Sequence, residues 1–223
     1  MIIAIISDVH ANFEALSSIA NELESADIIL VLGDLLGYYC QVNEVIDFLR
    51  IQKSVCVLGN HDYYLLHTCP SQTLPSVKFG IDFANSVITT NNRKWLSNLP
   101  LIRTMLIDNY SFLLCHGSPW DPLNEYLYPN NPALNLLKYF NFDVIAFGHT
   151  HREFLSRVDE KIIINPGSVG QSRNPNTKSC ACASILDTTK LKLKQIHQKF
   201  DPTLVVNLAM MHGADERIKK YLI

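Results

Sequence analysis

The sequence predicts an α/β protein in which two mixed β-sheets pack face to face as a sandwich, with helices on the outside. In the first half of the 223-residue chain, short apolar runs alternate with segments whose apolar residues recur at helical spacing. That alternation is typical of parallel strands joined by helices. In the second half, apolar runs come in pairs around short polar turns, which indicates hairpins. Parallel units followed by hairpins fit two mixed sheets better than one open sheet.

The first half of the chain contains three apolar runs that predict strands, at residues 2–6, 28–32 and 55–58. Helices are expected after the first two runs, at about 13–23 and 42–49, because their apolar residues lie three or four positions apart. A longer helical segment is predicted over 78–99, with a break near 89–92 and an end at Pro100.

The second half is expected to contain three hairpins, with turns at Asp108-Asn109, Asp159-Glu160 and Thr188-Thr189. A buried strand is expected at 144–147, and a helix near 133–140. One or two amphipathic helices are predicted over 204–223, around Gly213. These elements form a single domain over residues 1–223, with a helical tail from about 201 to 223.

Composition and charge argue against several classes of protein. The formal net charge of −2 disfavours a general nucleic-acid binder, but it allows a small phosphorylated substrate because metal ions supply local positive charge. No run approaches the ~18 to 20 apolar residues that a membrane span needs. The short apolar start has no basic segment before it, so a signal peptide is not expected. We expect a cytoplasmic protein without a membrane or nucleic-acid partner.

The six cysteines do not form the pattern of a disulfide framework. Cys56 and Cys115 fall within buried-strand patterns, where a free thiol acts as a small apolar group. Cys180 and Cys182 are spaced like a metal clip, but their stretch is strand-like and no second cysteine pair completes a site. Free thiols therefore fit a reducing compartment, and no metal is expected at the cysteines.

Side chains that bind metals follow five of the apolar runs. The segments are Asp8-Val9-His10, Gly33-Asp34, Gly59-Asn60-His61-Asp62, His116-Gly117 and Gly148-His149-Thr150-His151. Ligands of α/β sheets gather beyond the carboxyl ends of the strands. On extended backbone, residues two apart point to the same side, so each Asp-x-His or His-x-His pair can aim two ligands at one place. Taken singly, each motif also fits an ordinary turn or cap. Together, carboxylates, imidazoles and an amide suit two borderline divalent ions and predict a two-metal hydrolase.

These motifs resemble those of the calcineurin-like metallophosphoesterases, and the resemblance runs from residue 1 to about 186. Within that family, residues 8–12 (DVHAN) and 165–171 (NPGSVGQ) look like the compact prokaryotic phosphodiesterase-like branch. The resemblance implies a four-layer α/β/β/α sandwich with two mixed β-sheets, in agreement with the strand order predicted above.

The resemblance also implies seven metal ligands. One ion would be held by Asp8, His10 and His151, the other by Asn60, His116 and His149, and Asp34 would bridge both. Two divalent ions are expected, with manganese as the first candidate and iron, zinc or nickel as alternatives.

The implied reaction is hydrolysis of a small phosphodiester or phosphomonoester by direct attack of a metal-bridging hydroxide. His61 would protonate the leaving group and Asp62 would orient His61, although a purely structural role for His61 is the alternative. Other readings are a phosphoprotein or dinucleoside-polyphosphate phosphatase, or a non-catalytic interaction scaffold of the same fold. A homo-oligomer stays open.

Three further residues are candidates for substrate binding, namely Asn12, Ser168 and Arg173. Asn12 would lie just behind the metal ligands, and Ser168 belongs to a turn that either borders the site or is only structural. Arg173 could reach a phosphate oxygen or could be a solvated loop residue. Aromatic residues near the motifs could stack on a base or simply pack at the rim: Tyr38, Tyr39 and Trp120.

Overall fold

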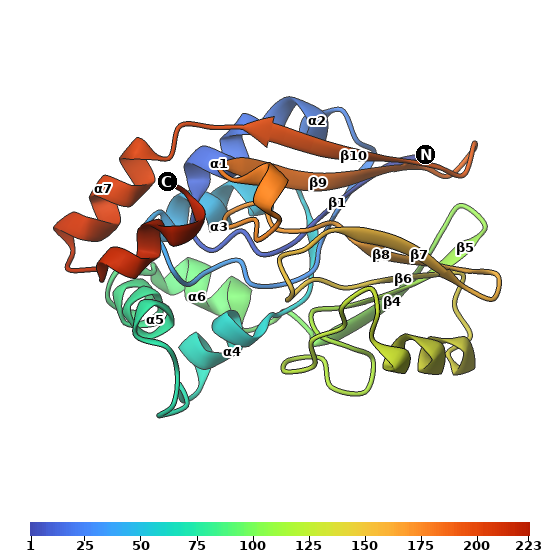
Figure 1. Ribbon diagram of the computed structural model, residues 1–223, viewed down its shortest axis with the longest axis horizontal. Coiled ribbons are helices and arrows are strands. Elements are labelled where there is room, and N and C mark those ends of the chain that lie inside the picture. The colour runs from blue at the N-terminus through green and yellow to red at the C-terminus, as the bar shows by residue number, and fades with distance from the viewer.

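The computed structural model describes residues 1–223, apart from the side chain of residue 221, and contains two five-stranded sheets (Figure 1). The N-terminal sheet has the order β10 (Lys192–Lys199), β9 (Cys180–Asp187), β1 (Ile2–Ile6), β2 (Ile28–Val31) and β3 (Val55–Cys56). The central sheet has the order β4 (Ile102–Ile107), β5 (Tyr110–Cys115), β6 (Val144–Ala146), β8 (Lys161–Asn165) and β7 (Phe154–Val158). Each sheet combines parallel neighbours with antiparallel hairpins, so both are mixed as predicted.

The alternation of side chains along each strand builds separate apolar layers. Ile5 of β1 and Phe112 of β5 meet in the core between the two sheets. Ile6 faces the opposite way, into the cluster under the helices. Leu113 lies on the outer face of the central sheet, beneath the 3-10 helix η1 (Pro132–Tyr139). The layers therefore follow the order helices, sheet, sheet, helical turn, which confirms the four-layer sandwich.

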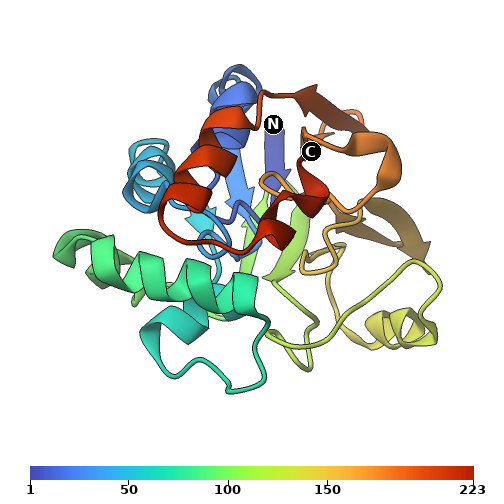
Figure 2. The same cartoon turned by 60° about the vertical axis from the view of Figure 1, so that its left-hand side comes forward.

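A layer of helices covers the outer face of the N-terminal sheet. Its members are α1 (Phe13–Ser18), α2 (Ala20–Glu24), α3 (Val42–Ile51), α4 (Asn60–Leu66), α5 (Pro75–Val87), α6 (Thr90–Leu96) and α7 (Thr203–Met211). The buried apolar residues of α3, beginning with Val42 and Val45, lie on one face of the helix, and α3 packs on the sheet through this face. Figure 2 shows α7 (red) beside α1 (blue), which it contacts.

Most of the predicted elements are confirmed. The three hairpins are β4–β5, β7–β8 and β9–β10. The long helical segment divides into α5 and α6 around Thr89, whose side chain caps the second helix. The tail forms α7 and the 3-10 helix η3 (Glu216–Tyr221) on either side of Gly213.

Several bounds differ from the prediction. The helix expected over 13–23 divides at Ile19 into α1 and α2. The strand expected over 55–58 ends at Cys56 and forms β3. The helix expected near 133–140 is a 3-10 helix, η1, rather than an α-helix. Helix α4, which begins inside the Gly59-Asn60-His61-Asp62 motif, was not predicted because its first turn is polar. A further short 3-10 helix, η2 (Pro175–Thr177), precedes β9.

Candidate metal centre

The five metal-binding motifs follow the carboxyl ends of five strands that run parallel within their sheets. Motifs of the N-terminal sheet follow β1, β2 and β3, and motifs of the central sheet follow β5 and β6. The two sheets therefore bring the motifs together from both sides of the sandwich.

The backbone around these ligands is left-handed rather than extended. The φ angle is +56° at Asp8, +54° at His10, +52° at Asp34, +66° at His149 and +56° at His151. Non-glycine residues rarely adopt this conformation, and such strain gathers at functional sites. The expectation of extended Asp-x-His and His-x-His segments was therefore wrong, although each pair does converge on one place.

The first group of converging ligands is Asp8, His10 and His151. One ligand atom from each lies within 4.8 Å of the other two. Asp8 Oδ1 is 3.2 Å from His151 Nε2, and the Nε2 atoms of His10 and His151 are 3.0 Å apart. All three side chains are buried, and Asp8 Oδ1 has no hydrogen-bond partner in the part of the chain that the structure describes.

The second group consists of Asp34, His116 and His149, with Asn60 beside them. Asp34 Oδ2 is 3.3 Å from His116 Nε2, which is 3.0 Å from His149 Nδ1 and 3.2 Å from Asn60 Oδ1. Asp34 also lies near the first group, since its Oδ2 is 3.9 Å from His10 Nε2. The structure thus brings together all seven predicted ligands, with Asp34 between the two groups.

The hydrogen bonds of three imidazoles show that the site suits a cation. His10, His116 and His151 each direct Nδ1 at a main-chain carbonyl oxygen, which can only accept a hydrogen bond. In the neutral ring, Nε2 is then a lone pair that faces the site. Two such lone pairs 3.0 Å apart, beside buried carboxylates, form a donor set that fits divalent metal ions.

The pKa values of the site point in the same direction. Burial opposes ionisation of Asp34, but His116 and His61 outweigh it and hold the pKa of that carboxyl well below its usual range. Burial also disfavours the charged form of His116, yet Asp34 raises the pKa of this imidazole to about 9. Burial and the neighbouring His116 lower the pKa of His149 to about 3. The protein alone thus places positive charge on His116 to balance its buried carboxylates.

His61 lies at the edge of the ligand set and faces a cavity. Its Nε2 is 3.7 Å from Asp34 Oδ2, and its Nδ1 has no hydrogen-bond partner among the described residues. Burial lowers the pKa of His61, so that the ring is neutral near pH 7 and carries a single N–H. The ring packs against Gly37, where a Cβ atom would come within 2.1 Å of Nδ1.

No hydrogen bond joins the Asp62 carboxylate to the His61 ring, so the predicted orienting role of Asp62 can act only through the backbone. The Asp62 carboxylate accepts hydrogen bonds from the backbone N–H groups of Leu35, Leu36 and Gly59. It therefore ties the loop after β2 to the start of α4. Burial, with the nearby Asp34 charge, raises its pKa to about 7 against the opposing effect of these three bonds.

Two of the substrate-binding candidates have structural contacts instead. Asn12 caps α1 by accepting from Ala15 N–H, and its amide donates to the Gly170 carbonyl. The Ser168 hydroxyl donates to the Asp8 carbonyl and accepts from the N–H of Gln171. Both side chains are fully buried, so neither offers a free group to a substrate.

Arg173 lines the cavity beside the metal ligands, and its guanidinium donates to the Tyr38 hydroxyl over 3.1 Å. This cavity has a volume of about 330 Å³ and is bordered by His61, Asn60 and residues of α4, α5 and the preceding loops. Tyr64 and Tyr126 also line it, and the ring of Tyr126 stacks on His149 with centroids 3.8 Å apart. Sequence reasoning missed both tyrosines. Tyr64 follows the Gly59-Asn60-His61-Asp62 motif on a helix that was not predicted, and Tyr126 lies in a loop without a periodic pattern.

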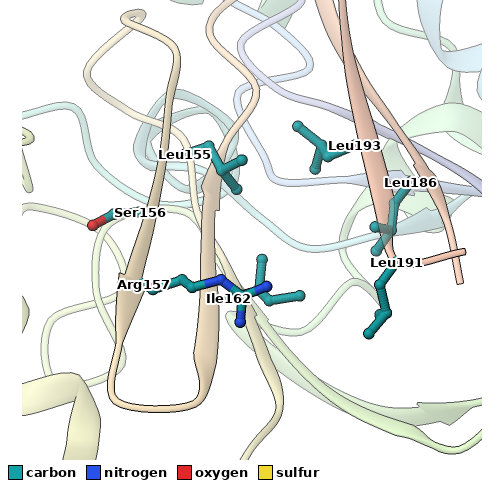
Figure 3. Close-up of a pocket in the computed structure, with 7 residues that line it drawn as sticks. All are labelled: Leu155, Ser156, Arg157, Ile162, Leu186, Leu191 and Leu193. Carbon is teal, nitrogen blue, oxygen red and sulfur yellow. The ribbon is translucent and has the colours of Figure 1, made fainter.

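A different cavity, of about 280 Å³, opens between β7 and the β9–β10 hairpin (Figure 3). Its lining is mostly apolar, with Leu155, Leu191 and Leu193 around it and Arg157 at one side. It contains none of the predicted ligands, so the chemistry of the site lies at the other cavity.

Comparison with known proteins identifies the family of the chain. Residues 1–188 match the family model of the calcineurin-like phosphoesterase superfamily domain. The chain belongs to this superfamily. As a member, it is a metal-dependent phosphoric ester hydrolase.

Individual relatives cover nearly the whole chain. The protein MJ0912 of Methanocaldococcus jannaschii is 33% identical over 222 residues, which cover 89% of this chain and 88% of that protein. The probable metallophosphoesterase MJ0623 of the same organism is 26% identical over 205 residues, or 89% of this chain and 83% of that protein. The crystal structure of a metallophosphoesterase from Sphaerobacter thermophilus matches with a TM-score of 0.84 at 25% identity. The match covers 99% of this chain and 97% of the Sphaerobacter chain.

No helix among the residues that the structure describes is long and apolar enough to cross a membrane.

Proposed function

We propose that this phosphoesterase binds two divalent metal ions and hydrolyses a small phosphodiester or phosphomonoester in the cavity beside them. The observation that carries the proposal is the position of Asp34 between two groups of ligands. Its Oδ2 is 3.3 Å from His116 Nε2 in one group and 3.9 Å from His10 Nε2 in the other. A carboxylate in that position can serve both ions.

The ligand assignment follows from the two groups. Asp8, His10 and His151 would hold one ion, Asn60, His116 and His149 the other, and Asp34 would bridge them. The set contains oxygen and nitrogen donors and no thiolate, which suits manganese as well as iron, zinc or nickel. When bound, two such ions lower the pKa of a shared water and neutralise the phosphate oxygens.

The remaining roles belong to side chains that face the cavity. His61 is in position to donate its N–H to the leaving oxygen, and a bound phosphate would raise its lowered pKa by charge attraction. Arg173 also lines this cavity and is in position to bind a phosphate oxygen. Tyr38, Tyr64 and Tyr126 offer flat rings to the organic part of the substrate.

The volume of the cavity favours a small substrate over a phosphoprotein. About 330 Å³ is at the low end of the range for small-molecule sites. The scaffold alternative of the same fold needs no His61, whereas hydrolysis does, so this residue separates the two functions.

The test is hydrolysis of bis-p-nitrophenyl phosphate and p-nitrophenyl phosphate by metal-stripped protein, with Mn²⁺, Ni²⁺, Zn²⁺ or Mg²⁺ added in turn. We expect metal-dependent turnover that Asp34→Asn abolishes together with binding of one or both ions. His61→Ala should lose about 10²- to 10⁴-fold in kcat and keep its metals.

The matched control is His212→Ala, since His212 packs on Phe83 away from the ligands and should not affect turnover. The ratio of the hydrolysis rates for the two substrates gives the preference for diesters or monoesters. Stoichiometric metal binding without turnover on either substrate would contradict hydrolysis of simple phosphate esters, and would favour a scaffold or a highly selective enzyme.

A further inference from the structure

A third group of metal-ligand side chains lies outside the proposed centre. It consists of Glu153, Cys182 and His197, and one ligand atom from each lies within 4.8 Å of the other two. His197 Nε2 is 2.5 Å from Glu153 Oε2. These residues come from the segment before β7, from β9 and from β10, so only the folded sheet assembles them.

The pairing of β9 with β10 places two of the three donors. Cys182 and His197 are directly opposite each other in this antiparallel pair, so their side chains share one face of the sheet. Glu153 approaches from the other sheet across Gly167. A Cβ at Gly167 would lie 3.1 Å from Cys182 Cβ and 3.3 Å from Glu153 Cβ, and the φ of +81° also favours glycine there.

The donors differ in exposure in a way that suits an ion entering from solvent. Cys182 is buried, with 1% of its surface exposed, whereas the side chains of Glu153 and His197 are 16% and 38% exposed. The second carboxylate oxygen of Glu153 accepts from the Asn174 amide at 3.3 Å. Outer hydrogen bonds of this kind hold metal-binding carboxylates in place.

We propose that Glu153, Cys182 and His197 form a zinc site that is separate from the hydrolytic centre. Imidazole, thiolate and carboxylate are the three donor types that zinc takes, and three protein ligands leave a fourth position for water. The ion replaces the direct bond between His197 and Glu153. The Cys182 thiol releases its proton to solvent, and His197 binds through its neutral nitrogen.

The alternatives explain less of the group. An ion pair of Glu153 with His197 accounts for two residues and leaves the Cys182 thiol with a long hydrogen bond of 3.9 Å to the Cys180 carbonyl. A nucleophilic cysteine is disfavoured because burial raises the pKa of Cys182 to about 11 and little of its surface is open to a substrate.

Zinc at this site would stabilise the backbone behind the hydrolytic centre. The N–H of Cys182 donates to the Ser168 carbonyl, and the Ser168 hydroxyl donates to the Asp8 carbonyl. Holding β9, β10 and the segment at Glu153 together therefore restrains the turn that supports Asp8.

Cobalt provides the test, because a thiolate bound to Co²⁺ gives a near-ultraviolet charge-transfer band and the hydrolytic centre has no thiolate. Metal-free full-length protein is titrated with Co²⁺ and followed by absorption. We expect the band in the wild-type protein, and we expect zinc to displace cobalt and remove it. Equilibrium dialysis should find one more equivalent of zinc in the wild-type protein than in Cys182→Ser.

The variants decide whether the band belongs to this site. Cys182→Ser and the surface substitution His197→Ala should each abolish it, while Cys180→Ser, on the same strand, should keep it. Asn174→Ala should weaken cobalt binding roughly 10- to 100-fold through the carboxylate it holds. Absence of the band in the wild-type protein, or its persistence in Cys182→Ser, would overturn the proposal. Neither result depends on hydrolytic activity, so the two proposals fail independently.

Discussion

At the scale of single residues, one hydrogen bond orients each of three histidines toward the candidate metal centre. His10, His116 and His151 each direct Nδ1 at a main-chain carbonyl, which leaves Nε2 toward the site. His61 has no such partner, and its ring is held by packing against Gly37. The position of the His61 ring therefore depends on the absence of a side chain at Gly37 rather than on a hydrogen bond.

Gly37→Ala should displace the His61 ring, since the new Cβ would lie 2.1 Å from Nδ1. We expect kcat to fall about 10²-fold while the metal content of the purified protein stays at the wild-type value. Turnover of bis-p-nitrophenyl phosphate and metal analysis of the same sample measure the two quantities.

The control is Gly213→Ala. Gly213 also has a positive φ, of +90°, but no atom of the described residues lies within 4 Å of the place that a Cβ would occupy there. This variant should lose about 1 kcal/mol of stability from backbone strain and keep its activity. Equal losses of kcat in both variants would mean that strain, and not the displaced imidazole, causes the effect at Gly37.

At the scale of elements, the loops that follow the strands carry the chemistry and are tied to one another by buried polar groups. Asp62 in the first turn of α4 binds the backbone N–H groups of Leu35, Leu36 and Gly59. Asp34, which stands between the two ligand groups, lies in the same loop as Leu35. The carboxylate of Asp62 thus holds Asp34 in place without touching the site.

Asp62→Ala should destabilise the protein by about 3 kcal/mol or more, because it leaves three buried N–H groups without a partner. The free energy of unfolding in urea measures this loss, and reduced metal affinity should accompany it. Asp82→Ala is the control, since Asp82 bonds only the exposed Lys78 and should cost less than about 1 kcal/mol. A stability loss at Asp62 no larger than at Asp82 would contradict the anchoring role.

At the scale of the whole molecule, the core between the two sheets fixes the distance between the ligands that come from one sheet and the ligands that come from the other. Phe112 of β5 is fully buried there, together with Ile3 and Ile5 of β1. Asp8 follows β1 and His116 follows β5, so the packing of these strands sets the distance between ligands from different sheets.

Phe112→Ala should lower the free energy of unfolding by about 3 to 5 kcal/mol through lost burial and a residual cavity. Leu106→Ala, on β4, is the matched control because 73% of Leu106 is exposed, and its cost should stay within about 0.5 kcal/mol. Urea denaturation of both variants measures the difference. Similar values for the two would mean that the inter-sheet core does not carry the stability assigned to it.

The sequence by itself predicted the strands, the hairpins and the motifs that contain the candidate ligands, because each of these depends on local pattern. The resemblance to the family then implied which seven residues of those motifs are ligands. Alternating or continuous apolar runs predict strands, and polar residues directly after them mark one edge of a sheet. The ends of α1, β3 and η1 depend on packing and were predicted less well.

The tertiary structure alone decided how the residues are used. The left-handed backbone at Asp8 and His149, the anchoring role of Asp62 and the tyrosines of the cavity all depend on contacts between segments far apart in the chain. Cys182 looked like an ordinary strand residue until the pairing of β9 with β10 set it opposite His197. Such groupings are invisible in the sequence, because the register between strands and the packing of one sheet on another are set by the folded chain as a whole.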